Sequence, residues 1–266
     1  PSLNMKYQMN EKNSLRFAFS RTVTRPSFIE MAPFLYQESY GSAQIRGNAD
    51  LQNGYNYNID LRYELFEKNG DMLSITAYYK HLKAPIERVQ TLSGGSAVHS
   101  FRNADNGMAT GVEIEFRKEI VKDLRFGVNG SYMYTNVKLP EGGAYTNSQR
   151  ALQGASPYLA NADLTYSPAF SNDRQLSVAL LYNLQGPRIH SVGISGLGDI
   201  KQQPVHTLNF TGSYRFNRRF AVKLQVNDLL NQDILFKQEV PTTGDKVEVE
   251  RFRKGTGFEV GFSYDL

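Results

Sequence analysis

The residues best suited to chemistry in this sequence are carboxylates and arginines that alternate along two short segments. They stand two residues apart: Asp60, Arg62 and Glu64 in one segment, and Glu113, Glu115 and Arg117 in the other. Two carboxylates on one strand face could act as a general acid and a general base. An arginine shares that face in both segments, however, and an arginine beside a carboxylate favours an ion pair. We therefore expect a salt-bridge ladder and not a catalytic pair.

Other catalytic and metal-binding patterns are missing from the sequence. The absence of Cys excludes disulfides, thiolate metal ligands and a thiol nucleophile. The four histidines lack metal-ligand spacing and are far apart: His81, His99, His190 and His206. GISGLG (193–198) does not match a dinucleotide or phosphate loop, and no GxSxG elbow occurs. The sequence thus predicts no enzyme, no metal site and no cofactor.

The segment 55–66 shows which element positions the charged residues. Tyr55, Tyr57, Ile59, Leu61, Tyr63 and Leu65 alternate with Asn56, Asn58, Asp60, Arg62 and Glu64. Successive side chains of a strand point to opposite faces, so one face is apolar and aromatic and the other is charged. About eleven segments repeat this period of two. They are 3–9, 15–19, 55–66, 73–80, 112–117, 124–135, 158–166, 176–183, 208–215, 220–227 and 258–265.

The connections between these strands alternate in length. Short polar turns are expected at 9–13, 67–71, 118–123, 168–173 and 216–219. Longer connections are expected at 25–53, 91–104, 139–154 and 188–203, with a tighter one, PTTGD, at 241–245. Turns of two to six residues join antiparallel neighbours, so the sheet is an up-and-down meander. Short turns on one side and long loops on the other are typical of outer-membrane barrels.

Composition separates a membrane barrel from a soluble β-sandwich or propeller, which is the main alternative. No apolar run approaches the roughly 20 residues of a membrane helix, but barrel strands have ordinary hydropathy because their two faces differ. Unlike charges on single strands would be costly in a sandwich core, whereas they suit a wet lumen. The residues expected to face the lumen are Asp60, Arg62, Glu64, Glu113, Glu115 and Arg117. The net charge of +4 is scattered along the chain, which argues against nucleic-acid binding. We predict an all-β, antiparallel, up-and-down transmembrane β-barrel in the outer membrane.

The predicted barrel is incomplete. The sequence opens within a strand pattern, PSLNMKYQMN, and bacterial barrels of one chain have an even strand number. An open sheet would expose unpaired backbone groups to lipid. We therefore expect residues 1–266 to be a single partial domain of a longer protein.

Two of the long connections carry candidate ligand-contacting residues. Long loops are often functional, and aromatic side chains mixed with charges suit ligand contact. The candidates are Arg25, Phe34, Tyr36, Tyr40 and Arg46 in loop 25–53, and Arg188 and His190 in loop 188–203. The alternative is that these side chains only pack loop against loop at the barrel mouth.

Six segments resemble the C-terminal half of the barrel of TonB-dependent outer-membrane receptors, particularly the Bacteroidetes type. They are FSRTVTRPSFIEMAPF (19–34), GNADLQNGYNYNIDLRYELF (47–66), NGMATGVEIEFRK (106–118), LQGASPYLANADLTY (152–166), LQVNDLLNQ (224–232) and GTGFEVGFSYDL (255–266). The most specific pieces are Arg25-Pro26 followed by Phe28, and the closing Gly-Phe-x-Val-Gly-Phe-Ser-Tyr. Two features depart from the family: the plug and TonB box are not in this sequence, and Leu266 replaces the usual terminal aromatic residue.

The resemblance implies a barrel of about 22 strands around a plug, of which this chain would supply about eleven. It also implies energised uptake of a scarce large ligand, such as a metal chelate, a cobalamin-like molecule or a glycan. The expected partners are outer-membrane lipid, the other barrel strands and plug, the TonB complex and the imported ligand. A passive diffusion channel and a surface-binding barrel without transport remain the alternatives.

Overall fold

A computed structural model describes residues 1–37, 44–67, 69–93, 96–139, 146–168, 170, 173–193, 196–240 and 242–265. Nearly all regular structure in this part of the chain is β-strand, and the helix α1 spans only Phe28–Met31. None of the helical structure described is both long and apolar enough to cross a membrane.

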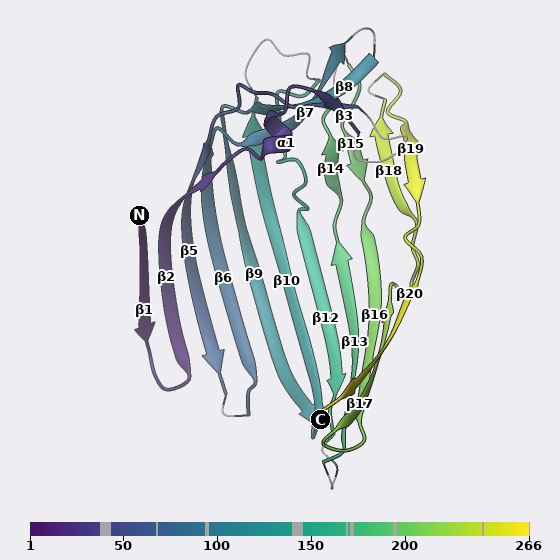
Figure 1. Cartoon of the computed structure of the whole chain (residues 1–266). Helices are drawn as coiled ribbons and strands as arrows, with labels where there is room; N and C mark the ends of the chain where they lie inside the picture. Colours follow the sequence, from purple (N-terminus) through teal and green to yellow (C-terminus); the bar gives the residue numbers. More distant parts are fainter. Residues whose placement is uncertain are drawn as a thin grey trace.

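Eleven strands form one antiparallel meander, in the order β1-β2-β5-β6-β9-β10-β12-β13-β16-β17-β20 (Figure 1). The predicted fold class is thus confirmed. The bounds are β1 Ser2–Gln8, β2 Asn13–Thr24, β5 Gly54–Phe66, β6 Met72–Lys83, β9 Asn106–Val121, β10 Leu124–Lys138, β12 Tyr158–Tyr166, β13 Gln175–Gln185, β16 Val205–Arg215, β17 Phe220–Asn227 and β20 Gly257–Tyr264. Each strand pairs with the next by an antiparallel register, as short turns require.

The short turns and the long connections lie at opposite ends of this sheet (Figure 1). The long connections carry the other strands, which build two four-stranded loop sheets. One loop sheet has the order β3-β4-β8-β7, with bounds Leu35–Tyr36, Ile45–Arg46, Ser96–Asn103 and Ile86–Ser93. The other has the order β14-β15-β18-β19, with bounds Arg188–Ser191, Ile200–Gln202, Ile234–Glu239 and Lys246–Phe252. β11 (Gln149–Arg150) pairs with the upper end of β10.

Two of the predicted connections were wrong in length. The last connection is longer than the turn expected at 241–245, because β18 and β19 form a hairpin that extends the connection over 228–256. The turn expected at 118–123 is reduced to Lys122 and Asp123, since β9 continues to Val121. Asp123 adopts a positive φ of 67° there, and its backbone N–H donates to the Glu119 carboxylate at 3.0 Å. Asp is one of the few residue types other than Gly that adopts this left-handed conformation as a single residue.

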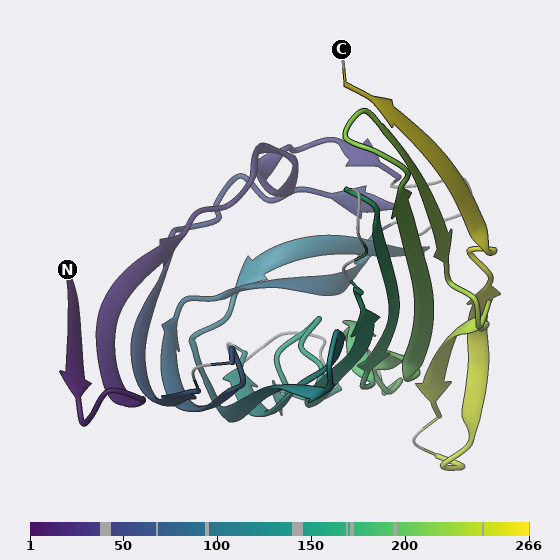
Figure 2. The same ribbon diagram turned by 90° about the horizontal axis from the view of Figure 1, so that it is seen from below.

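The sheet bends into an open arc when seen along its strands (Figure 2). Side chains on the inside of a curved sheet converge, whereas those on the outside spread apart. Ile59 and Leu61 are 43% and 47% exposed, while Glu64 and Ser74 are only 5% and 2% exposed. We call the side of Ile59, Leu61 and their row neighbours the apolar face and that of Asp60, Arg62 and Glu64 the charged face. The exposures place the apolar face on the convex side.

Many of the buried apolar side chains gather in the long connections and at the adjoining ends of the arc strands. Ala104, Val137 and Leu139 form a buried cluster, with Leu152 packed against it. The strands instead present large apolar side chains outward, including Phe258 at 76% and Phe262 at 72% exposure. This distribution is the reverse of a soluble domain, and it fits a sheet whose convex side meets hydrocarbon.

Candidate functional site

The charged face is organised around Glu64 at the lower half of β5. Its Oε2 accepts from Arg16 Nε at 2.7 Å and from Ser14 Oγ at 3.0 Å, both on β2. Its Oε1 accepts from Arg62 Nε at 2.9 Å. The alternation of strand side chains places these groups on one face, and the β2–β5 register sets Ser14 opposite Glu64 and Arg16 opposite Arg62. Glu64 is thus held by three donors.

The same network crosses β6 and reaches β9. Arg62 Nη2 lies 3.6 Å from Glu115 Oε2, and Arg117 Nη2 lies 2.7 Å from Glu115 Oε1. A carboxylate held between two arginines is a structural ion pair and is poorly suited to proton transfer. The geometry therefore agrees with the salt-bridge ladder expected for Glu115.

An amide ladder continues the row toward the other edge of the sheet. Asn161 Nδ2 donates to Asn129 Oδ1 at 2.7 Å, and Asn183 Nδ2 donates to Asn161 Oδ1 at 2.5 Å. Glu115 pairs with Asn129 in the β9–β10 register, so the two ladders share one level of the sheet. A continuous row of polar groups therefore runs from β2 to β13.

Glu113 and Asp60 lie on the same face, one step and two steps above the level of Glu115. Together with Arg16, Arg62 and Thr76 they line a hollow of about 410 Å³. All six residues expected to face the lumen thus share the charged face with one another. Whether that face encloses a lumen remains a prediction, because the arc is open (Figure 2).

The connection between β2 and β5 exposes several aromatic and apolar side chains. Ser27 and Glu30 form a capping box that starts α1, which presents Phe28 at 95% exposure. Phe34 is 57% exposed and packs edge-on against Tyr36, with ring centroids 6.2 Å apart.

The charged candidates of the same connection are exposed too. Arg25 directly follows β2, and Arg46 lies in β4 with its side chain exposed. Tyr40 lies outside the described residues. The structure thus places Arg25, Phe34 and Arg46 where a solute could reach them.

The candidates in the connection between β13 and β16 are engaged in packing. Arg188 Nε donates to Gln202 Oε1 at 2.7 Å across the β14–β15 pair. The His190 ring lies edge-on to Phe236 of β18, with centroids 4.8 Å apart. These contacts fit the alternative in which the two side chains hold loop to loop.

A buried polar cluster joins three of the long connections, and the sequence did not reveal it. Glu87 of β7 and Arg150 of β11 form an ion pair at 2.8 Å with side-chain exposures of 2% and 3%. Nearby, His99 of β8 accepts from Arg88 Nε at 2.9 Å, and its Nε2 lies 3.3 Å from the Ser191 hydroxyl of β14. Burial raises the pKa of the Glu87 carboxyl, while the Arg150 guanidinium opposes that rise.

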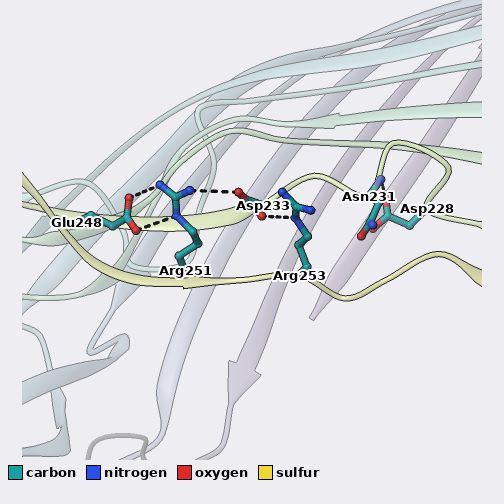
Figure 3. A network of polar contacts seen from close by, with 6 residues as sticks. All are labelled: Asp228, Asn231, Asp233, Glu248, Arg251 and Arg253. Atoms are coloured by element: carbon teal, nitrogen blue, oxygen red, sulfur yellow. Dashed lines mark hydrogen bonds and ion pairs between the residues drawn. The ribbon is translucent and has the colours of Figure 1, made fainter.

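A second network closes the base of the β18–β19 hairpin (Figure 3). Arg251 donates to both oxygens of Glu248 at 2.8 and 2.6 Å, and its Nη1 lies 3.3 Å from Asp233. Arg253 also donates to Asp233. The Arg253 hydrogen bond lowers the pKa of Asp233, and the Arg251 hydrogen bonds lower that of Glu248. Arg251 lies in the exposed strand β19 and Arg253 just beyond its end, so only the hairpin pairing could have predicted the cluster.

Within the described residues, no three His, Asp or Glu side chains converge as metal ligands would. His206 instead contacts the Tyr182 hydroxyl at 2.6 Å, and His81 packs beside Tyr57.

An antiparallel arc with an apolar convex side and a charged concave side defines an outer-membrane β-barrel protein. Residues 1–264 match the Outer membrane protein beta-barrel family, and the chain belongs to this family. The predicted outer-membrane location and the resemblance to receptor barrels are thereby confirmed.

The relatives of the chain are receptors. It is 22% identical over 253 residues to the ferric enterobactin receptor of Pseudomonas aeruginosa, covering 87% of this chain and 33% of that protein. The chain thus spans about a third of this relative.

Solved structures share the fold. A mutant of the P. aeruginosa ferric enterobactin receptor in complex with enterobactin gives a TM-score of 0.67 at 19% identity, covering 99% of this chain and 40% of that one. The siderophore receptor PirA of Acinetobacter baumannii gives 0.64 at 16% identity, covering 99% and 40%. The ferric yersiniabactin uptake receptor FyuA of Yersinia pestis gives 0.64 at 14% identity, covering 100% and 37%.

Proposed function

We propose that this chain is the C-terminal half of the barrel of a TonB-dependent receptor that takes up a ferric chelate. The observation that carries the proposal is the eleven-strand arc, which aligns over 99% of its length with 40% of a siderophore-receptor chain. The free edges of β1 and β20 would pair with the remaining barrel strands, because unpaired strand edges are not tolerated in hydrocarbon.

The polar groups of the charged face support the proposal that this face lines a lumen which a folded plug occupies. Arginines hold Glu64 and Glu115, and the asparagine amides hydrogen-bond to one another, so the row offers both donors and acceptors to a polar partner. The hollow near Asp60 gives such a partner room to interlock with the wall. A surface with both positive and negative groups can hold a plug through many contacts. It can also release the plug, because each exposed ion pair is individually weak.

The exposed loop residues support ligand capture at the mouth. Arg46 pairs with Leu35, the residue between Phe34 and Tyr36, in the β3–β4 register, and Arg25 is a second exposed cation of the same connection. Ferric chelates of the catecholate type carry negative charge and aromatic rings, which arginine and aromatic side chains bind together. Among the three ligand classes considered, the metal chelate is therefore the one we propose.

The test is uptake of a radiolabelled ferric catecholate by cells that carry the complete protein. The proposal requires uptake that stops when the proton motive force is collapsed, and that falls when Arg25 and Arg46 are both changed to Gln. A control is the double change of Arg218 and Arg219 to Gln, which also removes two positive charges, in a short turn at the opposite end of the sheet. Uptake that persists without the proton motive force would instead establish a passive diffusion channel. Binding without any uptake would establish a surface-binding barrel.

A further inference from the structure

The apolar face changes character toward the long connections. The register aligns Phe17, Leu61, Ala77 and Val112 in one row and Phe19, Ile59, Tyr79 and Thr110 in the next. The following two rows contain Arg21, Tyr57 and His81, and then Val23, Tyr55, Lys83, Asn106 and Lys138. Rows are about 7 Å apart along a strand. Toward the long connections, the two apolar rows are thus followed by two rows that combine tyrosines with cationic side chains. None of the residues named in these rows is a carboxylate.

Arg21 is the best positioned of these cations. Its guanidinium carbon lies 4.4 Å from the Tyr55 ring centroid and 5.8 Å from that of Tyr57, within cation–π distance of both. Among the residues that the structure describes, Arg21 forms no ion pair and its guanidinium donates no hydrogen bond. The rings therefore hold the group in place and leave its N–H donors available.

His81 and Lys83 extend the cluster on the neighbouring strand. The His81 ring packs beside Tyr57 with centroids 6.2 Å apart, and Lys83 pairs with Tyr55 in the β5–β6 register. Both side chains are exposed, and in the described part of the chain neither has an acidic partner. By contrast, three arginines of the charged face are bound to carboxylates: Arg16, Arg62 and Arg117.

We propose that Arg21, His81 and Lys83, framed by Tyr55 and Tyr57, bind the phosphate group of a phosphorylated lipid in the outer leaflet. The cluster lies on the face that meets lipid, directly beyond its apolar rows, where the head groups lie. Tyrosine rings occupy that interface, while Arg and Lys reach from it toward anionic head groups. Arginine matches phosphate by paired N–H donors, which a free guanidinium edge can provide.

The phosphate would neutralise charges that have no counter-ion in the fold. Its three oxygens accept several donors at once, so one head group could contact β2 and β6 together. Such a lipid would also fasten these strands just below the β2–β5 and β6–β9 connections that carry the loop aromatics. The proposal rests on the outer-membrane location and on long connections facing outward, and it does not depend on which ligand is imported.

The test measures lipid binding to the purified complete protein in detergent by native mass spectrometry. The probes are a phosphorylated glycolipid of the outer leaflet, the same lipid after phosphatase treatment, and inorganic phosphate. We expect the phosphorylated lipid to bind about tenfold or more tightly than the dephosphorylated one, because each Lys or Arg near an anionic head group adds attraction. The double variant R21Q and K83Q should lose that preference, whereas K80Q, a charge loss on the opposite face of β6, should keep it.

Equal binding of the two lipids by the unchanged protein would overturn the proposal, and this comparison needs no variant to fold. A preference that survives in the double variant would also overturn it. Inorganic phosphate that displaces the lipid at equal concentration would show a free-anion site and would overturn the assignment to lipid. None of these results bears on uptake, so failure here and failure of the transport proposal are separate.

Discussion

Placing one positive charge on either side of a single strand tests the assignment of the two faces. Leu61→Arg and Asp60→Arg alter adjacent residues near the middle of β5, which spans Gly54–Phe66. Leu61 belongs to the apolar face at 47% exposure and lies between Phe17 and Ala77 in the register. Asp60 lines the hollow on the charged face with Arg62 and Glu113.

The expected magnitudes follow from these positions. Leu61 is four residues from the row of Arg21, which is about 13 Å along the strand, so an arginine there begins deep in the apolar band. Arginine near the bilayer midplane of a barrel costs about 2–4 kcal/mol, equivalent to roughly 30-fold to 1000-fold in the folding equilibrium. Asp60→Arg adds a like charge near Arg62 in a wet hollow, for which about 1 kcal/mol or less is expected.

The assay is the fraction of heat-modifiable folded barrel in outer membranes across a urea gradient, using the complete protein. Leu61→Arg should move the unfolding midpoint well below that of Asp60→Arg. Leu61→Met keeps the apolar volume and should remain close to the unchanged protein. Equal losses in the two arginine variants, or a larger loss for Asp60→Arg, would refute the assignment of the apolar face to lipid.

The remaining predictions concern sidedness and the two loop networks. A cysteine at Thr243 in the β18–β19 turn should react with a membrane-impermeant reagent on intact cells, and one at Asn69 in a short turn should not; equal labelling would contradict the topology. Changing Arg150 to Met should destabilise the loop layer by about 3–5 kcal/mol because Glu87 would remain buried without its partner, and Glu87→Gln should restore part of the loss in the double variant. Because the pKa of Glu87 is raised in the folded state, the contribution of Glu87 to folding stability is largest below the ordinary Glu pKa and is lost as pH rises through the raised value. Hydrogen exchange of β7, measured as a function of pH, would detect this loss. Asp233 has a lowered pKa, so its contribution to the stability of the β18–β19 hairpin is present above the ordinary Asp pKa and is lost as pH falls through the lowered value. Limited proteolysis of the hairpin should accelerate as pH falls through that value. Asp233→Asn should abolish this pH dependence.

The strands could be predicted from the sequence because the direction of each side chain in a barrel wall depends only on local alternation. Each strand residue has only two possible directions, so period-two alternation assigned Ile59 and Asp60 to opposite faces without any knowledge of distant contacts. The alternation of short and long connections then fixed the meander, because turns such as 216–219 cannot join anything but antiparallel neighbours. The same reasoning placed charged residues together, although it could not say which arginine binds Glu64.

The loop layer could not be predicted in this way. The long connections consist of short strands whose partners are distant in sequence, such as β4 beside β8 and β15 beside β18. The hairpin of β18 and β19 therefore remained hidden, and PTTGD suggested only a tight turn. His190 was a ligand candidate by residue type, but packing against Phe236 gave it a structural contact.

The sequence by itself determined the fold class, the strand order and the two faces, because these depend on alternation and turn length. Only the tertiary structure decided that Glu87 meets Arg150, that Asp233 holds both Arg251 and Arg253, and that Arg21 rests on Tyr55. Each of these contacts joins segments that are apart in the sequence, and the strand register that brings the segments together is set by the sum of many backbone hydrogen bonds. No local pattern around any one of these residues carries that information.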